Sequence, residues 1–340
     1  MAAILRTLPL SRRFVLGAGL AGLGLLTGCG LPGAGGTAPA KVHRIGNLLG
    51  GPPTAASAAQ VAAFRQGMGD LGYSEGQNLV TLQHYAEGSD ELAAPAAALV
   101  RLDPEVIVVP GIPAVRAVLA ASTVIPIVSA GAGNSLVNAG LVASHARPGG
   151  VVTGLSTSSL VGKQLQLLQE VVPSLSRVAV LFDATSPEFR SLRREPYEAA
   201  ARTLGLTVVF VGTGGAADLE AAIAGATGEH ADGLFVTTGP ALLANQSRIA
   251  DLATLSRLPS MWQQSEAVRG GGLLGYGHNR VEGYRRAAYF VDRILKGTPP
   301  AELPIEEPMR FDFIINLRTA QALSLTIPQH VLLQATEIIQ

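Results

Sequence analysis

An internal repeat constrains the fold of this chain more than any other feature. Arg44-Ile45-Gly46 is matched by Arg177-Val178-Ala179, and Leu71-Gly72 is matched by Leu204-Gly205, in both cases about 133 positions later. The run EVIVVPGIPA is matched by DGLFVTTGPA, and IPIVSA by LPSMWQ, at nearly the same offset. Landmarks that recur at one spacing predict two similar units, each long enough to be a domain.

Within each unit, short apolar runs alternate with helical patterns. Residues 43–49 and 105–110 have the composition of strands, and apolar residues at helical spacing predict a helix over residues 56–71 that Gly72 closes. Strands that alternate with helices favour parallel sheets. We therefore predict an α/β protein of two Rossmann-like lobes, each a parallel sheet flanked by helices, joined by a hinge that the chain crosses several times.

The C-terminal part of the chain does not begin a third unit. It contributes a helical pattern near residues 281–295, the proline-rich connection TPPAELPIEEP, the strand-like RFDFIIN and a short helix. These are too few elements for a domain, so we expect them to complete the two lobes. The expected lobe 1 is residues 41–155 plus about 276–303, and the expected lobe 2 is residues 156–275 plus about 304–340.

The N-terminus has the organisation of a bacterial export signal. Arg6, Arg12 and Arg13 precede an apolar stretch that is too short to span a bilayer. The run Leu26-Thr27-Gly28-Cys29 resembles a lipobox, which predicts a signal peptide over residues 1–28 and acylation of Cys29. The paired arginines partly match a twin-arginine signal, and the general secretory route stays open as the alternative. Residues 29–40 are rich in Gly and Pro and are expected to form a flexible tether.

Charge and composition exclude several classes of protein. The 340 residues carry 25 basic and 25 acidic side chains, and removing residues 1–28 leaves 22 basic against 25 acidic. The mature protein is thus mildly acidic, and we expect no nucleic-acid partner, because there is no basic excess to neutralise phosphates. A single cysteine excludes a disulfide framework and a Cys-rich metal site. We expect no metal and no cofactor.

Small residues follow the predicted strands, where open α/β sheets bind ligands. Glycine lets a ligand approach the backbone, and helix N-termini offer free N–H groups that suit a carboxylate. Ordinary strand-to-helix turns use the same residues, so the prediction depends on several loops acting together. The candidate ligand-binding residues of these loops are Asn47, Gly51, Pro52, Gly111, Ile112, Pro113, Ala114, Ser129, Ala130, Gly131, Asn134, Ser156, Thr157, Asp183, Thr238, Gly239 and Pro240.

Two aromatic residues are further candidates. Trp262 lies just past a predicted strand, and Tyr276 lies in the glycine-rich run GGLLGYG. An aromatic side chain at a cleft edge would give a flat apolar wall with a polar handle. Packing in the core is the alternative for each of them.

Catalytic motifs are absent from the sequence. There is no GxSxG elbow, no HExxH pair and no P-loop. His278, close to Tyr276, is the best candidate for a catalytic base if the cleft belonged to a hydrolase or isomerase. We therefore expect that the protein is not an enzyme and that it has no catalytic residue.

The mature sequence resembles the ABC transporter substrate-binding protein family, which includes binding lipoproteins for tryptophan and other aromatic amino acids. The resemblance covers residues 41–335 and is most distinctive in ARPGG, TGLS and ILKG. Other matching stretches are FRQGMGDLGYSEGQNL, IPIVSAGAGNSLVNAGLVASHARPGGVVTGLST and RIADLATLSRLPSMW.

This resemblance implies a type I periplasmic-binding-protein architecture whose lobes close on a solute and present it to a membrane permease. Family ligands contact loops matching 47–53, 111–114, 129–134, 156–157, 183 and 238–240. The chain has Asn134-Ser135 where members often have Asp-Pro, and Asp183-Ala184-Thr185 where members often have an Asn-containing loop. These exchanges alter the charge of the cleft, so tryptophan is not carried over as the ligand.

The expected protein is a monomeric, exported lipoprotein that faces the periplasm or the cell exterior. It would bind a small carboxylate-bearing solute, an amino acid or a related compound, for an ABC importer. A ligand-sensing lipoprotein that feeds a membrane receptor is the alternative function, and a cleft enzyme is a further one.

Overall fold

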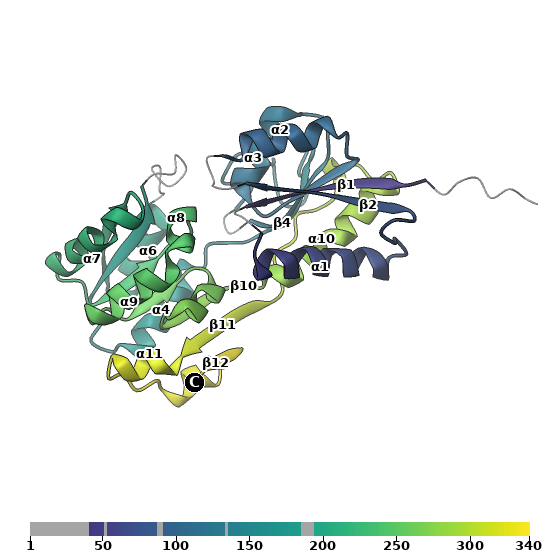
Figure 1. Cartoon of the computed structure of the whole chain (residues 1–340). Helices are drawn as coiled ribbons and strands as arrows, with labels where there is room; N and C mark the ends of the chain where they lie inside the picture. Colours follow the sequence, from purple (N-terminus) through teal and green to yellow (C-terminus); the bar gives the residue numbers. More distant parts are fainter. Residues whose placement is uncertain (1–40, 51–52, 87–90, 133–134, 185–193) are drawn as a thin grey trace, which may run out of the picture. The chain divides into compact units, whose positions relative to one another are not determined.

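The computed structural model describes residues 41–50, 53–86, 91–132, 135–184 and 194–340 (Figure 1). The predicted signal peptide, the tether and Cys29 lie outside the described residues. Among the helices of these ranges, none combines the length and the hydropathy needed to span a bilayer.

The first sheet has five parallel strands in the order β2-β1-β3-β4-β5. Three helices connect the first four strands in sequence. The bounds of these elements are β1 His43–Gly50, α1 Ala55–Asp70, β2 Leu79–Ala86, α2 Ala93–Arg101, β3 Val106–Val109, α3 Ile112–Ala121, β4 Ile127–Ala132 and β5 Val152–Ser156.

The second sheet has seven strands in the order β12-β11-β10-β9-β8-β6-β7. All pairs are parallel except β10 with β11. Its strands are β6 Arg177–Asp183, β7 Thr207–Thr213, β8 Gly233–Val236, β9 Ser260–Trp262, β10 Leu274–His278, β11 Phe311–Asn316 and β12 Glu337–Ile339. The helices of this part of the chain are α4 Val161–Val171, α6 Glu195–Leu204, α7 Leu219–Gly228, α8 Pro240–Ala244, α9 Gln246–Leu255, α10 Arg280–Leu295, α11 Leu317–Ala322 and α12 Gln329–Leu332.

The strand orders confirm the internal repeat. The first sheet reads second, first, third, fourth, fifth strand, and β7-β6-β8-β9-β10 reads in the same order within the second sheet. The predicted α/β class with parallel sheets flanked by helices is therefore confirmed. Among the described strands, β11 and β12 have no counterpart in the first sheet, and they extend the second sheet beyond β10.

Helices cover both faces of the first sheet. Apolar side chains of α1 and α10, among them Phe64 and Phe290, pack on one face with Ile45 and Leu49 of β1. Helices α1 and α10 approach closely because position 67 is glycine: a Cβ there would lie 2.6 Å from the Arg285 carbonyl oxygen. Helices α2 and α3 pack on the opposite face. Although α10 follows β10 in the chain, its core partners lie in the first sheet (Figure 1).

Helices also cover both faces of the second sheet. Helices α4 and α6 pack on one face, where the Tyr197 ring meets Phe210 and Phe235 edge to face with centroid distances of 6.0 and 5.4 Å. Helices α7 and α9 pack on the other face. Burial of these apolar side chains is the main force that holds each helix to its sheet.

Three segments that connect elements of the two sheets are hydrogen-bonded to one another. The Ser156 N–H donates to the Glu306 carbonyl oxygen at 3.0 Å, and the Glu306 N–H donates to the Gly154 carbonyl oxygen at 3.0 Å. The Asn279 N–H donates to the Arg310 carbonyl oxygen at 2.9 Å. We refer to residues 154–158, 278–283 and 304–310 as the crossing segments.

Candidate ligand-binding site

The predicted ligand residues that the structure describes lie at or near the carboxyl ends of strands in both sheets. Gly51, Pro52 and Asn134 lie outside the described residues, and of Pro240 only the backbone is described. The remaining residues form two groups, one at the carboxyl edge of each sheet.

Asn47 is the most unusual polar residue of the first edge. It lies on β1 opposite Val108 of β3, and its exposed fraction is 0%. Within the described residues neither its Oδ1 nor its Nδ2 has a hydrogen-bond partner. Burial of an unpaired amide is costly, so this side chain needs a partner such as water or a ligand.

Thr157 presents a second buried polar atom at this edge. It follows β5 directly, is 3% exposed, and its Oγ1 has no hydrogen-bond partner in the described part of the chain. The neighbouring Ser156 has a structural task, because its Oγ accepts the Leu136 N–H at 3.0 Å and holds the loop after β4.

The start of α3 offers backbone donors at the same edge. Gly111, Ile112 and Pro113 are partly exposed, and Ala114 is buried. Among the residues that the structure describes, no side chain caps this helix, since its N-cap is Gly111 and no side-chain hydrogen bond is formed there. The N–H groups of Ile112 and Ala114 therefore belong to an uncapped helix N-terminus that carries positive partial charge.

Residues 129–131, which precede the last residue of β4, have small side chains. Ser129 and Ala130 are buried, and Gly131 has φ of +141°, a conformation that L side chains rarely adopt. A Cβ at Gly131 would lie 3.0 Å from Nε2 of His278. Glycine is thus required here for both conformation and space.

Asp183 is the central residue of the second edge. It ends β6, is 1% exposed, and its Oδ2 accepts the Ala241 N–H at 3.0 Å. The side chain packs against the backbone of Gly239, where a Cβ would lie 2.8 Å from the Asp183 Cβ. The start of α8 is therefore capped by an acid of the chain itself, and this edge is suited to a cationic group more than to an anion.

Gln263 belongs to this edge, although sequence reasoning did not assign it. It follows β9 directly, and its Oε1 accepts the Thr238 N–H at 3.1 Å. Its position as the first residue after a strand was the signal that could have identified it, because carboxyl ends of parallel strands meet at one edge.

The structure places Trp262 in the hydrophobic core. The side chain is 2% exposed among residues of α7, α9 and the turn 265–270, and its indole N–H donates to Ser260 Oγ at 3.0 Å. This position does not fit the predicted aromatic wall of a cleft. It fits the packing alternative instead.

Tyr276 lies on β10 and packs within the second sheet. Its ring stacks on Phe311 with a centroid distance of 5.8 Å and meets Phe313 edge to face. Burial raises the pKa of its phenol. Gln164 of α4 donates to the Tyr276 carbonyl oxygen at 2.6 Å, while the buried Gln164 Oε1 has no partner within the described residues.

His278 is packed against the backbone of the first sheet. Burial, reinforced by the charge of Arg280, lowers the pKa of its imidazole to about 4, and a hydrogen bond with the Gly131 backbone opposes this shift. The imidazole is therefore neutral at physiological pH. Within the described residues it forms no hydrogen bond to a serine or threonine that could act as a nucleophile, so nothing in this geometry supports the catalytic alternative.

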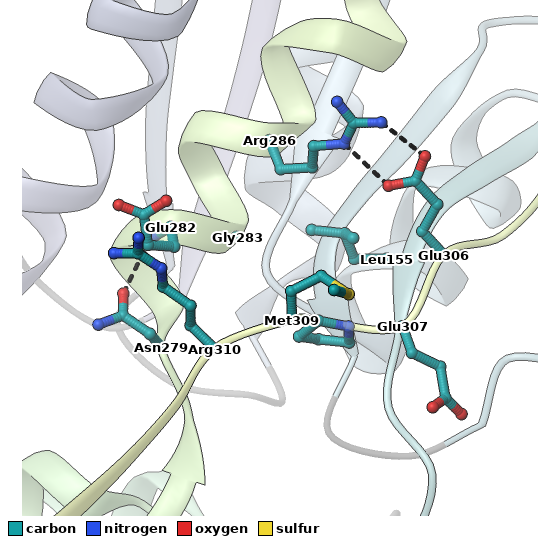
Figure 2. Close-up of a pocket in the computed structure, with 10 residues that line it drawn as sticks. Leu155, Asn279, Glu282, Gly283, Arg286, Glu306, Glu307, Met309 and Arg310 are labelled. Atoms are coloured by element: carbon teal, nitrogen blue, oxygen red, sulfur yellow. Dashed lines mark hydrogen bonds and ion pairs between the residues drawn. The ribbon is translucent and has the colours of Figure 1, made fainter. Parts of the chain in front are cut away.

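A cavity of about 150 Å³ lies among the crossing segments (Figure 2). Arg286 of α10 and Glu306 face one another beside it in a two-point ion pair of 2.8 and 2.7 Å. Met309, which is 94% exposed, forms part of its lining. None of the predicted ligand residues lines this cavity, although its lining includes Leu155 of β5 and Asn279, the residue that follows β10.

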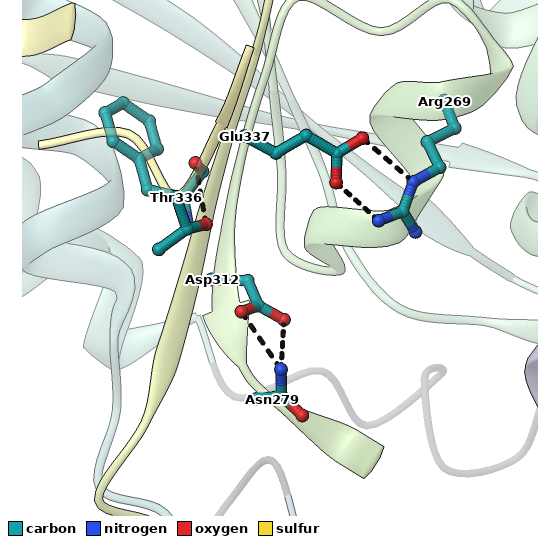
Figure 3. A network of polar contacts seen from close by, with 6 residues as sticks. Arg269, Asn279, Asp312, Thr336 and Glu337 are labelled. Carbon is teal, nitrogen blue, oxygen red and sulfur yellow. Dashed lines mark hydrogen bonds and ion pairs between the residues drawn. The ribbon is translucent and has the colours of Figure 1, made fainter. Parts of the chain in front are cut away.

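A polar network fixes the end of β10 to β11 (Figure 3). The Asn279 amide donates to both carboxylate oxygens of Asp312 at 3.1 and 3.0 Å, while its Oδ1 accepts the Glu282 N–H and caps α10. Arg269 and Glu337 form a second pair that ties the turn 265–270 to β12. Across the described ranges, no group of three or more His, Cys, Asp or Glu side chains is arranged to hold a metal ion.

Comparison with known proteins identifies the relatives of this chain. A sequence model of the ABC transporter substrate binding protein family matches residues 54–339. A tyrosine-binding protein of Clostridioides difficile is 24% identical over 263 residues, which make up 77% of this chain and 75% of that protein.

Solved structures share the fold over most of the chain. A conserved domain protein of Vibrio cholerae has a TM-score of 0.79 at 25% identity, over 88% of this chain and 100% of its own. A Streptococcus pneumoniae protein, solved as an ABC domain in complex with L-Trp, also has a TM-score of 0.79, at 21% identity and with the same coverage. These likenesses confirm the predicted type I periplasmic-binding-protein architecture.

Proposed function

The chain belongs to the ABC transporter substrate-binding protein family, and from this premise we propose that it binds a free aromatic α-amino acid between its two strand edges. The family match covers residues 54–339, which include every predicted ligand residue except Asn47, Gly51 and Pro52. The tyrosine-binding relative supports an aromatic amino acid as the solute.

The buried carboxylate of Asp183 is the observation that carries this proposal. A negative charge at 1% exposure is favourable only with compensating partners, and the Ala241 N–H is one of them. The ammonium group of an amino acid would add a full opposite charge at the same edge. Charge-assisted hydrogen bonds of this kind are about twice as strong as neutral ones.

The carboxylate of the solute suits the uncapped start of α3. The N–H groups of Ile112 and Ala114 lie there, and a helix N-terminus stabilises an anion by about 0.3–1 kcal/mol. Asn47 and Thr157 provide buried polar atoms at the same edge that lack partners within the described residues. A polar solute or its bound water would satisfy them.

Contact with both edges would make binding and lobe closure one event. A solute whose ammonium group binds at Asp183 and whose carboxylate binds at α3 has its full affinity only when both edges reach it. It would therefore shift the protein toward a closed form, since a ligand shifts an equilibrium by its differential affinity for the two states. The closed form would deliver the solute to an ABC permease.

Export and anchoring complete the proposal. The resemblance of the run from Leu26 to Cys29 to a lipobox supports an exported mature protein that a lipid anchor would hold outside the cytoplasm. In this position the binding protein would capture solute next to the permease.

Titration calorimetry of the processed protein tests the proposal. We expect L-tyrosine, L-tryptophan or L-phenylalanine to bind. The analogue 3-(4-hydroxyphenyl)propionate lacks the ammonium group and so loses a charge-assisted hydrogen bond. It should bind at least about tenfold more weakly than L-tyrosine. Asp183→Asn should remove most of this discrimination, while the exposed control Asp251→Asn should retain it. Equal affinity for the two solutes would contradict the role of Asp183.

A further inference from the structure

The side chain of Gln263 has a fixed orientation at the second edge. Its backbone N–H donates to the Val236 carbonyl oxygen at 3.0 Å, as a continuation of the pairing between β8 and β9. Its side chain reaches across the end of β8, where Oε1 accepts the Thr238 N–H at 3.1 Å. A backbone N–H can be accepted only by the oxygen of the amide, so this contact decides which end of the side chain points away from Thr238.

The amide nitrogen of Gln263 is the part of the side chain that can contact a solute. Gln263 is partly buried, and within the described residues its Nε2 forms no hydrogen bond. Because Oε1 accepts the Thr238 N–H, the other end of the amide is Nε2. This nitrogen carries two N–H donors and cannot accept a hydrogen bond. A solute group that meets this nitrogen must therefore be a hydrogen-bond acceptor.

Asp183 and Gln263 lie on opposite sides of one short piece of backbone. Gln263 contacts Thr238, and Asp183 packs against the next residue, Gly239. The strand order β9-β8-β6 places the ends of the two flanking strands on either side of β8. A buried acid and an oriented amide donor thus flank residues 238–239.

We propose that Gln263 donates to the carboxylate of the bound amino acid and makes the site select acids over amides. This inference rests on the proposed function, in which Asp183 binds the ammonium group. In an α-amino acid the ammonium and carboxylate groups share one carbon atom, so the carboxylate lies close to the ammonium group. A carboxylate accepts several hydrogen bonds, so it can contact both Gln263 and the start of α3.

The substitution Gln263→Glu separates this role from a structural one. Glutamate keeps an oxygen that accepts the Thr238 N–H, but it replaces the donor with a second acceptor. Gln264→Glu is the matched control, because it makes the same change at the next, also partly buried position. Gln263→Met is a second test variant, which removes the donor without adding charge.

The experiment measures the dissociation constants of L-tyrosine and L-tyrosinamide, and those of L-tryptophan and L-tryptophanamide. We expect wild type to bind the acid more tightly than the amide. In Gln263→Glu this preference should fall about tenfold to a hundredfold, which is the loss of affinity expected when a hydrogen bond to a charged group is removed. In Gln263→Met the preference should also fall. Gln264→Glu should retain the wild-type ratio.

The outcomes distinguish the inference from the proposed function. If wild type binds amino acids and Gln263→Glu or Gln263→Met keeps the acid-to-amide ratio, the inference is wrong and the proposed function stands. The same conclusion follows if Gln264→Glu lowers the ratio equally. If wild type binds none of these amino acids, the proposed function is wrong and the inference fails with it.

Discussion

The imidazole of His278 lies against the backbone of Gly131. A Cβ at position 131 would be 3.0 Å from Nε2 and 3.1 Å from Cδ2 of the ring, and Gly131 itself has φ of +141°. His278 is the last residue of β10 in the second sheet, whereas Gly131 is the penultimate residue of β4 in the first. This contact therefore joins the carboxyl end of a strand in one sheet to that of a strand in the other.

Replacement of Gly131 by alanine should destabilise the protein through both backbone strain and this contact. Strain at such a conformation costs about 1–3 kcal/mol, and the added Cβ meets the ring. Gly140→Ala is the control, because Gly140 also has a positive φ, +69°, but open space around its Cβ position. Thermal unfolding should show a larger loss for Gly131→Ala.

A double-mutant cycle isolates the contact with the ring. Adding His278→Ala to Gly131→Ala removes the atoms that the new Cβ meets, so we expect a coupling energy of about 0.5–3 kcal/mol, as for residues in contact. Additive effects would show that the ring does not limit the space at Gly131.

The low pKa of His278 predicts a loss of stability in acid. Its imidazole has a pKa of about 4 in the folded protein, against 6.5 for an ordinary histidine, so the unfolded chain binds the proton more tightly. The contribution to stability is full above pH 6.5, declines as the pH falls toward 4, and amounts to at most about 3 kcal/mol. Denaturant unfolding at pH 7, 5.5 and 4.5 measures this slope.

The variant His278→Gln should flatten the pH dependence. Glutamine keeps a polar side chain of similar reach but does not titrate. The difference in unfolding free energy between wild type and variant removes the contributions of the other titrating groups. A difference that does not change with pH would contradict the assigned pKa.

The fold was predictable because the repeat is carried by physical constraints on the sequence. Buried parallel strands need apolar runs, and a helix often ends at a glycine with positive φ. Gly205, which ends α6 with φ of +69°, is an example. These signals are local and occur twice. The expectation that residues of about 276–303 belong to lobe 1 rests on the C-terminal elements being too few for a third domain, because the apolar stripe of α10 does not itself specify which sheet it covers.

The sequence predicts a site at two strand edges but does not predict the direction of single side chains there. Small residues after strands are visible in the sequence, whereas the direction of a side chain at a strand end depends on tertiary packing. Trp262 is the last residue of β9 and points into the core, while Gln263, one position later, reaches over the edge to Thr238. A shift of one residue reverses the face of the sheet.

The core position of Trp262 predicts that its replacement affects stability and spares binding. Trp262→Phe removes the indole N–H bond to Ser260 and leaves space beside Gly272, whose Cβ position the indole occupies. We expect a loss of about 1–3 kcal/mol in unfolding free energy and an unchanged dissociation constant for the amino acid. A weaker affinity without loss of stability would instead place Trp262 at the ligand.

Cys29 predicts how the protein is held at the membrane. It is the only cysteine of the chain, so Cys29→Ser should abolish all thioether-linked lipid, which metabolic labelling with a radioactive fatty acid measures. Each buried methylene contributes about 0.8 kcal/mol to membrane binding, so several acyl chains anchor stably where none would bind. In detergent phase partitioning, wild type should enter the detergent phase and the variant should enter the aqueous phase.

Ala34→Ser, in the tether, is the control and should retain lipid, because it leaves the run from Leu26 to Cys29 intact. Lipid label that persists in Cys29→Ser would refute the lipobox assignment.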